Sequence, residues 1–473
     1  MADVATYIDE EKDLAMTPRT LSPENNDGEV VIPGQKLPGF WWQRWGQGLN
    51  LKDQFAHEEH QAVKYKVLEW WQVGALMIAE TISLGILSLP QAVAALGMIP
   101  GLVFIFVMGG LAWITGNEYG KLKLKYPGIC DVADSGYMLF GRFGWYLFSI
   151  AQLVVFVFIM AAHITSFSIM MNVVTEHGAC SILFALTGFG VSFILALPRT
   201  LKSQSIFSFV SCVSVTAAVI ITMISVGVTK PNPNNFQWAN TASDFPHAMV
   251  ALLNIIMAYS GHVAYFGFTS ELREPKDFWK SLTMLLGSSS VLYIVTGCVI
   301  YYYVGTGVPS PALGAASPLV RKIAYGIAVP TIVVAGVING HVASKHVYLR
   351  VWRETSVPHE RTFKSWSSWV GIVFALWVLA WIIAEAIPNF HHLLALVSAL
   401  FCGWFSFGIT GFFYLYRNWE DIRQGKRKLG VVFNIGIVIM GFLICILGLY
   451  ASITTLSQGE GGSPFSCADN ADE

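Results

Sequence analysis

The chain has 473 residues, of which 54% are hydrophobic and only 12% are charged, whereas about 25% of the residues of soluble domains are charged. This composition excludes a soluble enzyme, and a net charge of −1 leaves no overall positive field that would attract a nucleic acid. The seven cysteines form no C-x-x-C pair and have no histidine at metal-ligand spacing. We therefore expect neither a metal site nor another cofactor.

Long apolar stretches dominate the chain, and a helix of about 20 apolar residues crosses the hydrocarbon core of a bilayer. The sequence therefore predicts an all-α integral membrane protein, in contact with the lipid bilayer, with 11 transmembrane helices. In chain order, the predicted segments 1 to 11 cover residues 70–96, 99–118, 145–171, 180–198, 206–228, 246–268, 281–304, 326–349, 366–386, 390–416 and 430–455. Segment 4 is the weakest of them, because it is short and contains Gly188 and Gly190.

The basic residues give the orientation of these segments. Only three of the 29 Lys and Arg residues, Lys230, Arg321 and Lys322, fall in regions expected outside when the N-terminus is cytoplasmic. Cationic loops are retained in the cytoplasm during insertion. Residues 1–69 are therefore expected to form a cytoplasmic acidic N-terminal tail, and residues 458–473 an extracellular acidic tail. A disulfide between the external Cys180 and Cys467 is one possible pairing.

The N-terminal tail is too polar to form a core of its own. A solvated tether is the simplest interpretation, and a regulatory tail is the alternative, since Thr17-Pro18 and Ser22-Pro23 are potential phosphorylation motifs.

Two segments carry signals for a break within the membrane. Segment 1 contains Gly85, which loosens a helix, and Pro90, which lacks a backbone donor; the alternative is a simple proline kink. Segment 6 has a second signal at Tyr259-Ser260-Gly261. Breaks five segments apart predict an inverted five-plus-five repeat, with copies at residues 70–228 and 229–416, followed by a cytoplasmic loop and helix 11 at residues 417–457.

Broken helices suit a zwitterionic ligand. Amides at residues 86–88, at the positive end of a helix dipole, would hold a carboxylate. Carbonyls at residues 259–261 would hold an ammonium group, so the pair of breaks predicts an α-amino acid as the ligand.

Two stretches resemble a known family, the amino acid/auxin permeases of the amino acid, polyamine and organocation superfamily. They are Glu80 to Pro90 (ETISLGILSLP) and Ser260-Gly261-His262 followed by Glu271 to Phe278 (ELREPKDF). The whole chain is most similar to the neutral amino acid permeases of filamentous fungi, of the methyltryptophan-resistance type. The resemblance implies proton-coupled uptake of neutral aliphatic and aromatic L-amino acids at the plasma membrane. It places substrate contacts at Ser83, Gly85, Ile86, Leu87, Tyr259, Ser260 and Gly261.

Ionisable residues inside a membrane are costly, and each is a candidate for function. Glu80, His341 and Lys345 are the candidates for proton coupling, with a Glu80–His341 relay as the specific hypothesis; the alternatives are a structural carboxylate, a structural histidine and a lysine that reaches the surface. His262 and Glu271 are candidates for gating, with packing and a membrane-edge position as their alternatives.

The sequence favours a proton-coupled secondary transporter. A sodium-coupled or vacuolar relative, and a sensor that binds amino acids without transporting them, stay open. A membrane enzyme would need a converging catalytic set, and a channel would need a ring of like charges; the sequence shows neither motif.

Overall fold

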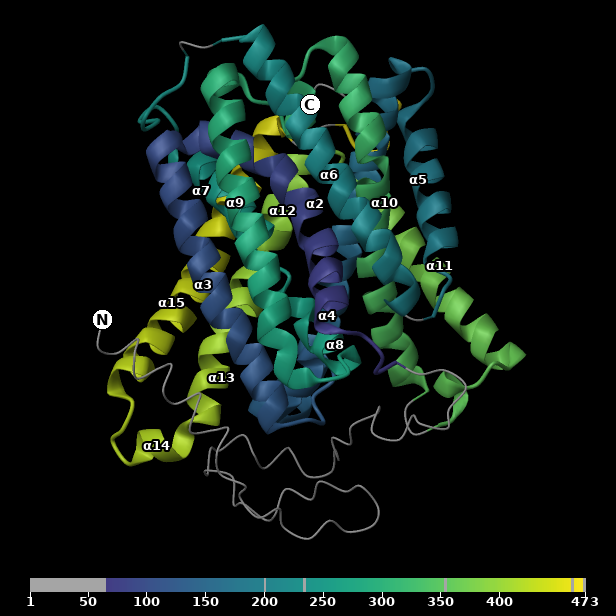
Figure 1. Ribbon diagram of the computed structural model, residues 1–473, viewed down its shortest axis with the longest axis vertical. Helices are drawn as coiled ribbons and strands as arrows, with labels where there is room; N and C mark the ends of the chain where they lie inside the picture. Colours follow the sequence, from purple (N-terminus) through teal and green to yellow (C-terminus); the bar gives the residue numbers. More distant parts are fainter. Residues whose placement is uncertain (1–64, 200, 233–234, 353–354, 461–462, 471–473) are drawn as a thin grey trace.

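The computed structural model describes residues 65–199, 201–232, 235–352, 355–460 and 463–470. The described chain is a bundle of roughly parallel and antiparallel helices (Figure 1). Among the described residues, the β-structure is limited to an isolated parallel bridge between Leu68 and Leu272. The predicted N-terminal tail lies almost entirely outside the described residues.

The helices follow the predicted segments closely. They are α2 (Trp70–Leu96), α3 (Met98–Lys125), α4 (Val132–Thr175), α5 (Ser181–Leu195), α6 (Leu201–Thr229), α7 (Phe245–Ala258), α8 (His262–Glu271), α9 (Phe278–Val304), α10 (Pro318–Val351), α11 (Phe363–Ala386), α12 (Phe390–Val397), α13 (Ile409–Arg417), α14 (Trp419–Arg423) and α15 (Lys428–Thr455). A π-helical segment, Ser398–Gly408, joins α12 to α13. The all-α membrane fold is therefore confirmed.

The count of eleven spans is not confirmed. The described residues contain ten apolar helices long enough to cross a membrane, and α5, with 15 residues, is too short to be counted with them. Fifteen residues of helix extend about 22 Å. The chain around α5 nevertheless reaches both ends of the bundle, because Cys180 is bonded to the C-terminal tail and Arg199 donates to the Glu360 carbonyl at the opposite end.

The broken helix in segment 6 is confirmed. Helix α7 ends at Ala258, α8 begins at His262, and the residues between them leave the helical path. Helices α7 and α8 together form one membrane span, Phe245–Glu271. The end of α7 and the start of α8 therefore leave backbone groups without intrahelical partners inside the bundle.

The predicted discontinuity in segment 1 is wrong, because α2 runs as one helix through Gly85 and Pro90. A Cβ atom on Gly85 would lie 2.7 Å from the Tyr293 hydroxyl and 2.9 Å from the Ala258 Cα atom. Close packing of α2 on α7 therefore accounts for the glycine. Pro90 removes one hydrogen bond, to the Ile86 carbonyl, without ending the helix.

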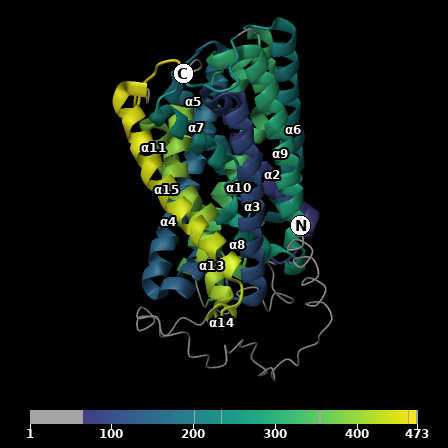
Figure 2. The same cartoon turned by 90° about the vertical axis from the view of Figure 1, so that its left-hand side faces the viewer.

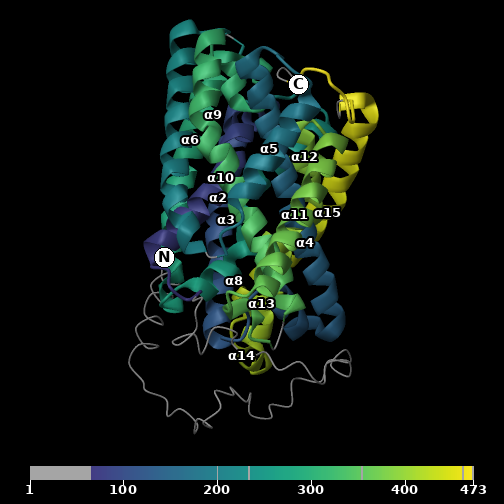
Figure 3. The ribbon, with the colours of Figure 1, turned by 90° about the vertical axis from the view of Figure 1, so that its right-hand side faces the viewer.

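Two groups of helices frame the break. Helices α2, α3, α7 and α9 pack on one another, and α4, α5, α10 and α11 form a second packed group, with α6 lying against both α10 and α2. The first described residues lie at the lower end of the bundle, which we call the Tyr65 end. The tail after α15 lies at the upper end, the Cys467 end, and α15 leans across the bundle between these ends (Figures 2 and 3).

Candidate functional site

The break between α7 and α8 is held by side-chain hydroxyls. Tyr293 of α9 donates to the Ala258 carbonyl at 2.9 Å and lies 3.4 Å from the Thr81 carbonyl, so it connects the end of α7 with α2. Ser260 donates to the Ile256 carbonyl at 2.6 Å. The bond from Tyr293 satisfies the Ala258 carbonyl at the end of α7. Ser260 adds a second donor to the Ile256 carbonyl, which also accepts from the Tyr259 amide.

Glu80 lies directly at this break. Its side chain accepts a hydrogen bond from Thr81 Oγ1 at 2.8 Å, and its Oε2 atom lies 3.1 Å from the position that a Cβ atom on Gly261 would occupy. Gly261 caps the N-terminus of α8, where backbone amides and the helix dipole favour a negative charge. A carboxyl group with 6% exposure thus meets the positive end of a half-helix in the middle of the bundle.

The residues predicted to contact substrate share one buried region. Gly85 touches Ala258 next to the break, and Tyr259 directs its hydroxyl to Ser290 of α9 at 3.2 Å. The other predicted residues, Ser83, Ile86, Leu87, Ser260 and Gly261, are also buried. In α2, however, residues 86–88 lie inside a continuous helix, so this structure does not present their amides as the predicted carboxylate cradle.

His262 faces α3. Its Nε2 atom lies 3.0 Å from Thr115 Oγ1 and 3.3 Å from the Ala112 carbonyl, and its ring packs against Tyr119 and Tyr265. These contacts match the packing alternative, because they fix the start of α8 against α3.

The hypothesis of a Glu80–His341 relay finds no direct contact in the structure. The His341 ring packs edge-on against Trp369 of α11, with 5.3 Å between the ring centroids. His163 of α4 lies beside Gly336 of α10, where a Cβ atom would be 2.9 Å from the histidine Cβ atom. Among the described residues, no hydrogen bond joins Glu80 to either ring.

Lys345 and Glu271 come together at the Tyr65 end. They form a buried ion pair between α10 and the end of α8, in which the Glu271 side chain is 1% exposed. The Lys345 ammonium also lies 4.2 Å from the centroid of the Tyr65 ring. Burial raises the pKa of Tyr65 to about 12, so this phenol is neutral near pH 7.

The segment before α2 closes over this pair. Leu68 donates its amide to the Glu271 carbonyl at 3.0 Å, and the Arg273 amide donates to the Leu68 carbonyl at 2.8 Å. Tyr65 donates to the Pro358 carbonyl at 3.3 Å, a carbonyl that Arg199 also contacts. The Tyr65 end is therefore sealed by a strap, residues 65–69, that bridges α8, α10 and the loop before α11.

A second charged cluster, near the same end, joins α4 to α10. Arg350 contacts both oxygens of Asp131, at 3.1 and 3.0 Å, and His346 Nδ1 lies 3.0 Å from Oδ2. Burial acts to raise the pKa of Asp131, but His346 and Arg350 outweigh it and hold the pKa below its ordinary value. This carboxylate fixes the start of α4.

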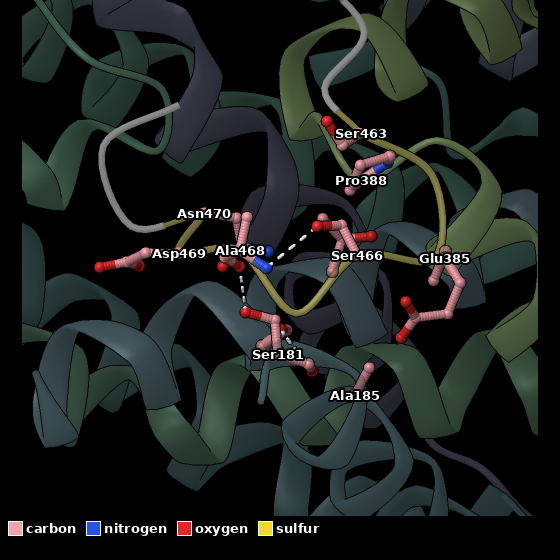
Figure 4. Close-up of a pocket in the computed structure, with 12 residues that line it drawn as sticks. Ser181, Ala185, Glu385, Pro388, Ser463, Ser466, Ala468, Asp469 and Asn470 are labelled. Atoms are coloured by element: carbon pink, nitrogen blue, oxygen red, sulfur yellow. Dashed lines mark hydrogen bonds between the residues drawn. The ribbon is translucent and has the colours of Figure 1, made fainter. Parts of the chain in front are cut away.

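The Cys467 end carries a small polar pocket under the C-terminal tail. Figure 4 shows the tail residues Ser463, Ser466 and Ala468 lying against Ser181 of α5 and Glu385 of α11. Cys180 and Cys467 form a disulfide with 4.5 Å between their Cα atoms, so the possible pairing is confirmed. The pocket lies at the opposite end of the bundle from the ion pair of Lys345 and Glu271.

Sequence reasoning missed the partners that hold this arrangement together. Tyr293 and Tyr65 are ordinary residues by pattern and no motif marks them, and Thr81 lies in the stretch Glu80 to Pro90 without having been given a role. The one signal that could have found Tyr293 is the cost of burying a tyrosine hydroxyl without a hydrogen-bond partner in an apolar segment.

Comparison with solved structures shows the same fold in membrane transporters. A mutant of the manganese transporter of Eremococcus coleocola matches with a TM-score of 0.57 and 13% identity, over 86% of this chain and 93% of that chain. The structure of MhsT in complex with L-phenylalanine matches with a TM-score of 0.54 and 11% identity, over 84% of this chain and 99% of that chain. The chain thus shares its fold, the LeuT fold, with these solved structures.

Sequence comparison specifies the family. The family model described as transmembrane amino acid transporter protein matches residues 66–454. The N amino acid transport system protein of Neurospora crassa is 35% identical over 460 residues, which cover 94% of this chain and 96% of that protein. A transmembrane transporter of Gibberella moniliformis is 27% identical over 88% of this chain and 90% of its own length. The chain belongs to the transmembrane amino acid transporter family and is an amino acid transporter, as the resemblance implied.

Proposed function

We propose that this protein imports neutral aliphatic and aromatic L-amino acids across the plasma membrane by symport with protons. The observation that carries the proposal is the Glu80 carboxyl group at the break beside Gly261. A carboxyl group at the start of α8 can bind a proton in one state of the cycle and release it in another. Its position beside the candidate substrate residues couples that proton to the bound amino acid.

The Tyr65 end is the cytoplasmic side in this proposal. The disulfide at the opposite end supports this orientation, because disulfides persist in oxidising, extracytoplasmic environments. The basic loops counted in the sequence give the same orientation.

Closure of the Tyr65 end then acts as the cytoplasmic gate. Lys345 and Glu271 connect α10 to α8, and the strap of residues 65–69 covers them. Release of substrate to the cytoplasm requires the separation of α8 from α10, so this ion pair has to open in every cycle. Glu271 therefore serves as a gating residue, and Lys345 holds the gate rather than carrying the transported proton.

Two groups of helices supply the moving parts. Alternating access in this fold is largely rocking of one group against another around a fixed site. The group of α2 and α7 packs around Gly85 and the break, whereas α4 and α10 form the other wall.

Labelled phenylalanine uptake into proteoliposomes tests the proposal. The full chain is reconstituted and uptake is compared under an inward proton gradient, an inward sodium gradient and neither. Accumulation with the proton gradient alone supports symport with protons. Accumulation driven by sodium alone would refute proton coupling, and binding without uptake would identify a sensor.

Glu80→Gln is the decisive variant, with Glu385→Gln as its matched control. Both change a carboxylate to an amide, but Glu385 lies in the pocket at the Cys467 end. We expect Glu80→Gln alone to remove proton-driven accumulation while exchange of internal for external phenylalanine continues.

A further inference from the structure

The tail at residues 463–470 is attached to the Cys467 end at several points. Besides the disulfide to Cys180, Ser181 Oγ donates to the Ala468 carbonyl at 2.5 Å. Asn172 Nδ2 donates to Asn470 Oδ1 at 2.6 Å, and Asn470 is buried although it lies in a tail. The tail is thus anchored to the corner formed by α4 and α5.

A second anchor lies on the far side of the pocket. The Phe465 amide donates to the Glu385 carbonyl at the end of α11 at 3.0 Å. The tail therefore spans from α11 to the corner of α4 and α5 and covers the polar pocket between them (Figure 4).

The tail also links the two groups of helices described above. It follows α15, and α15 packs on α7: a Cβ atom on Gly448 of α15 would lie 2.9 Å from Leu253 of α7. The disulfide consequently ties a helix that packs against the broken segment to the group of α4, α5, α10 and α11. The disulfide therefore restrains movement of α7 away from that group at the Cys467 end.

We propose that the C-terminal tail is a redox-sensitive latch, in which the Cys180–Cys467 disulfide restrains opening of the Cys467 end and an external dithiol releases it. The inference uses the orientation given in the proposed function, which exposes this end to the outside. Cys467 is an exposed residue, so an external dithiol can approach the disulfide. A dithiol thiolate bonds to one cysteine sulfur as the disulfide breaks, and its second thiol then displaces that cysteine. Both cysteines end as thiols, with two electrons and two protons supplied by the dithiol, which becomes a cyclic disulfide.

Native Cys402 provides a readout of opening that does not depend on transport. It is buried in the π-helical segment, with its sulfur 3.5 Å from that of Met257 near the break. An external, membrane-impermeant methanethiosulfonate reagent reaches it only when the bundle opens. The rate is followed on the Cys402 peptide by mass spectrometry, in the full chain in right-side-out vesicles.

We expect modification of Cys402 to be about threefold faster or more in the Cys180→Ser/Cys467→Ser variant than in the native chain, because the restraint on the open state is removed. Treatment of the native chain with dithiothreitol, followed by its removal, should give the same increase. The same treatment should not change the Cys402 modification rate in the double variant. Cys445→Ser on α15 is the matched control, since Cys445 is a free cysteine, and it should behave like the native chain.

Equal Cys402 rates in latched and released proteins, with reduction verified by peptide mass, would overturn the proposal. If the double variant does not fold, reduction of the folded native chain makes the same comparison. If the untreated native chain shows no proton-driven uptake, the proposed function is refuted. The latch is tested separately, because the Cys402 modification rate is measured without a gradient.

Discussion

Replacing Gly85 tests the contact between α2 and α7 most directly. In Gly85→Ala the new Cβ atom would lie 2.7 Å from the Tyr293 hydroxyl, 2.8 Å from the Ala258 Cβ atom and 2.9 Å from the Ala258 Cα atom. A backbone atom cannot rotate away, so α2 has to move from α7. Overpacking of this kind costs about 1–3 kcal/mol, and the gain of about 1 kcal/mol in helix propensity offsets only part of it.

The substitution therefore destabilises the conformation seen in the structure, in which α2 packs closely on α7. A penalty of about 2 kcal/mol changes the population of one state relative to another by roughly 30-fold. We therefore expect Gly85→Ala to reduce uptake strongly, and Gly85→Val to abolish it, with both proteins still at the cell surface. The assay pairs initial phenylalanine uptake with surface labelling and with thermal unfolding in detergent.

Two glycines provide controls for Gly85. A Cβ atom on Gly110 of α3 would meet no atom within 4 Å, and one on Gly74 of α2 would meet mainly the flexible side chain of Met284. Alanine at either position should leave uptake nearly unchanged. Normal uptake and unfolding of Gly85→Ala would refute the claim that this glycine is required for close packing of the two helices.

Three further predictions concern the charged and aromatic residues. Lys345→Met removes the ammonium partner of the buried Glu271 carboxylate, which should cost about 3–5 kcal/mol of stability; the double variant with Glu271→Met should recover most of the loss in thermal unfolding. Tyr259→Ala should shift uptake preference among leucine, phenylalanine and tryptophan, because the ring lies at the break, whereas Tyr259→Phe keeps the ring and should shift it little. Asp131 has a folded-state pKa below its ordinary value, so its contribution is present above about pH 4 and is lost as the pH falls further. Asp131→Asn should therefore lower stability at pH 7 and flatten the decline in acid.

Each of these predictions has a contrary result. A double variant at Lys345 and Glu271 as unstable as the single one would show that the pair is not the source of the loss. An unaltered preference profile in Tyr259→Ala would put the side-chain pocket elsewhere. If Asp131→Asn unfolds in acid with the same pH dependence as the native chain, the carboxylate is not linked to folding.

The fold was largely predictable because membrane spans are encoded locally, in apolar length and in flanking charge. Segment 1 was expected at residues 70–96, where α2 lies, and the break at Tyr259 to Gly261 follows from glycine and polar residues within an apolar run. The same local signals misled at Gly85 and Pro90. At Gly85 the deciding factor is a contact with Ala258, far away in the sequence, that no local pattern reveals.

The site was predictable only in part, for the same reason. Burial of Glu80 could be inferred from its place in an apolar segment, whereas for Lys345 and Glu271 the sequence left a position at the membrane surface open. The pairing of Lys345 with Glu271, 74 residues apart, depends on where α8 lies relative to α10, and the separation of Glu80 from His341 depends on how α2 packs on α10. Spacing along a chain cannot supply the rotation of each helix about its axis.

The disulfide also has a consequence for biogenesis. Its two cysteines are 287 residues apart, and the chain between them contains every helix from α5 to α15. Cys180 emerges early from the ribosome and, in the proposed orientation, stays without its native partner until the tail beyond α15 has been translocated. The bond can therefore form only after the intervening helices have been made and both cysteines lie on the same side of the membrane.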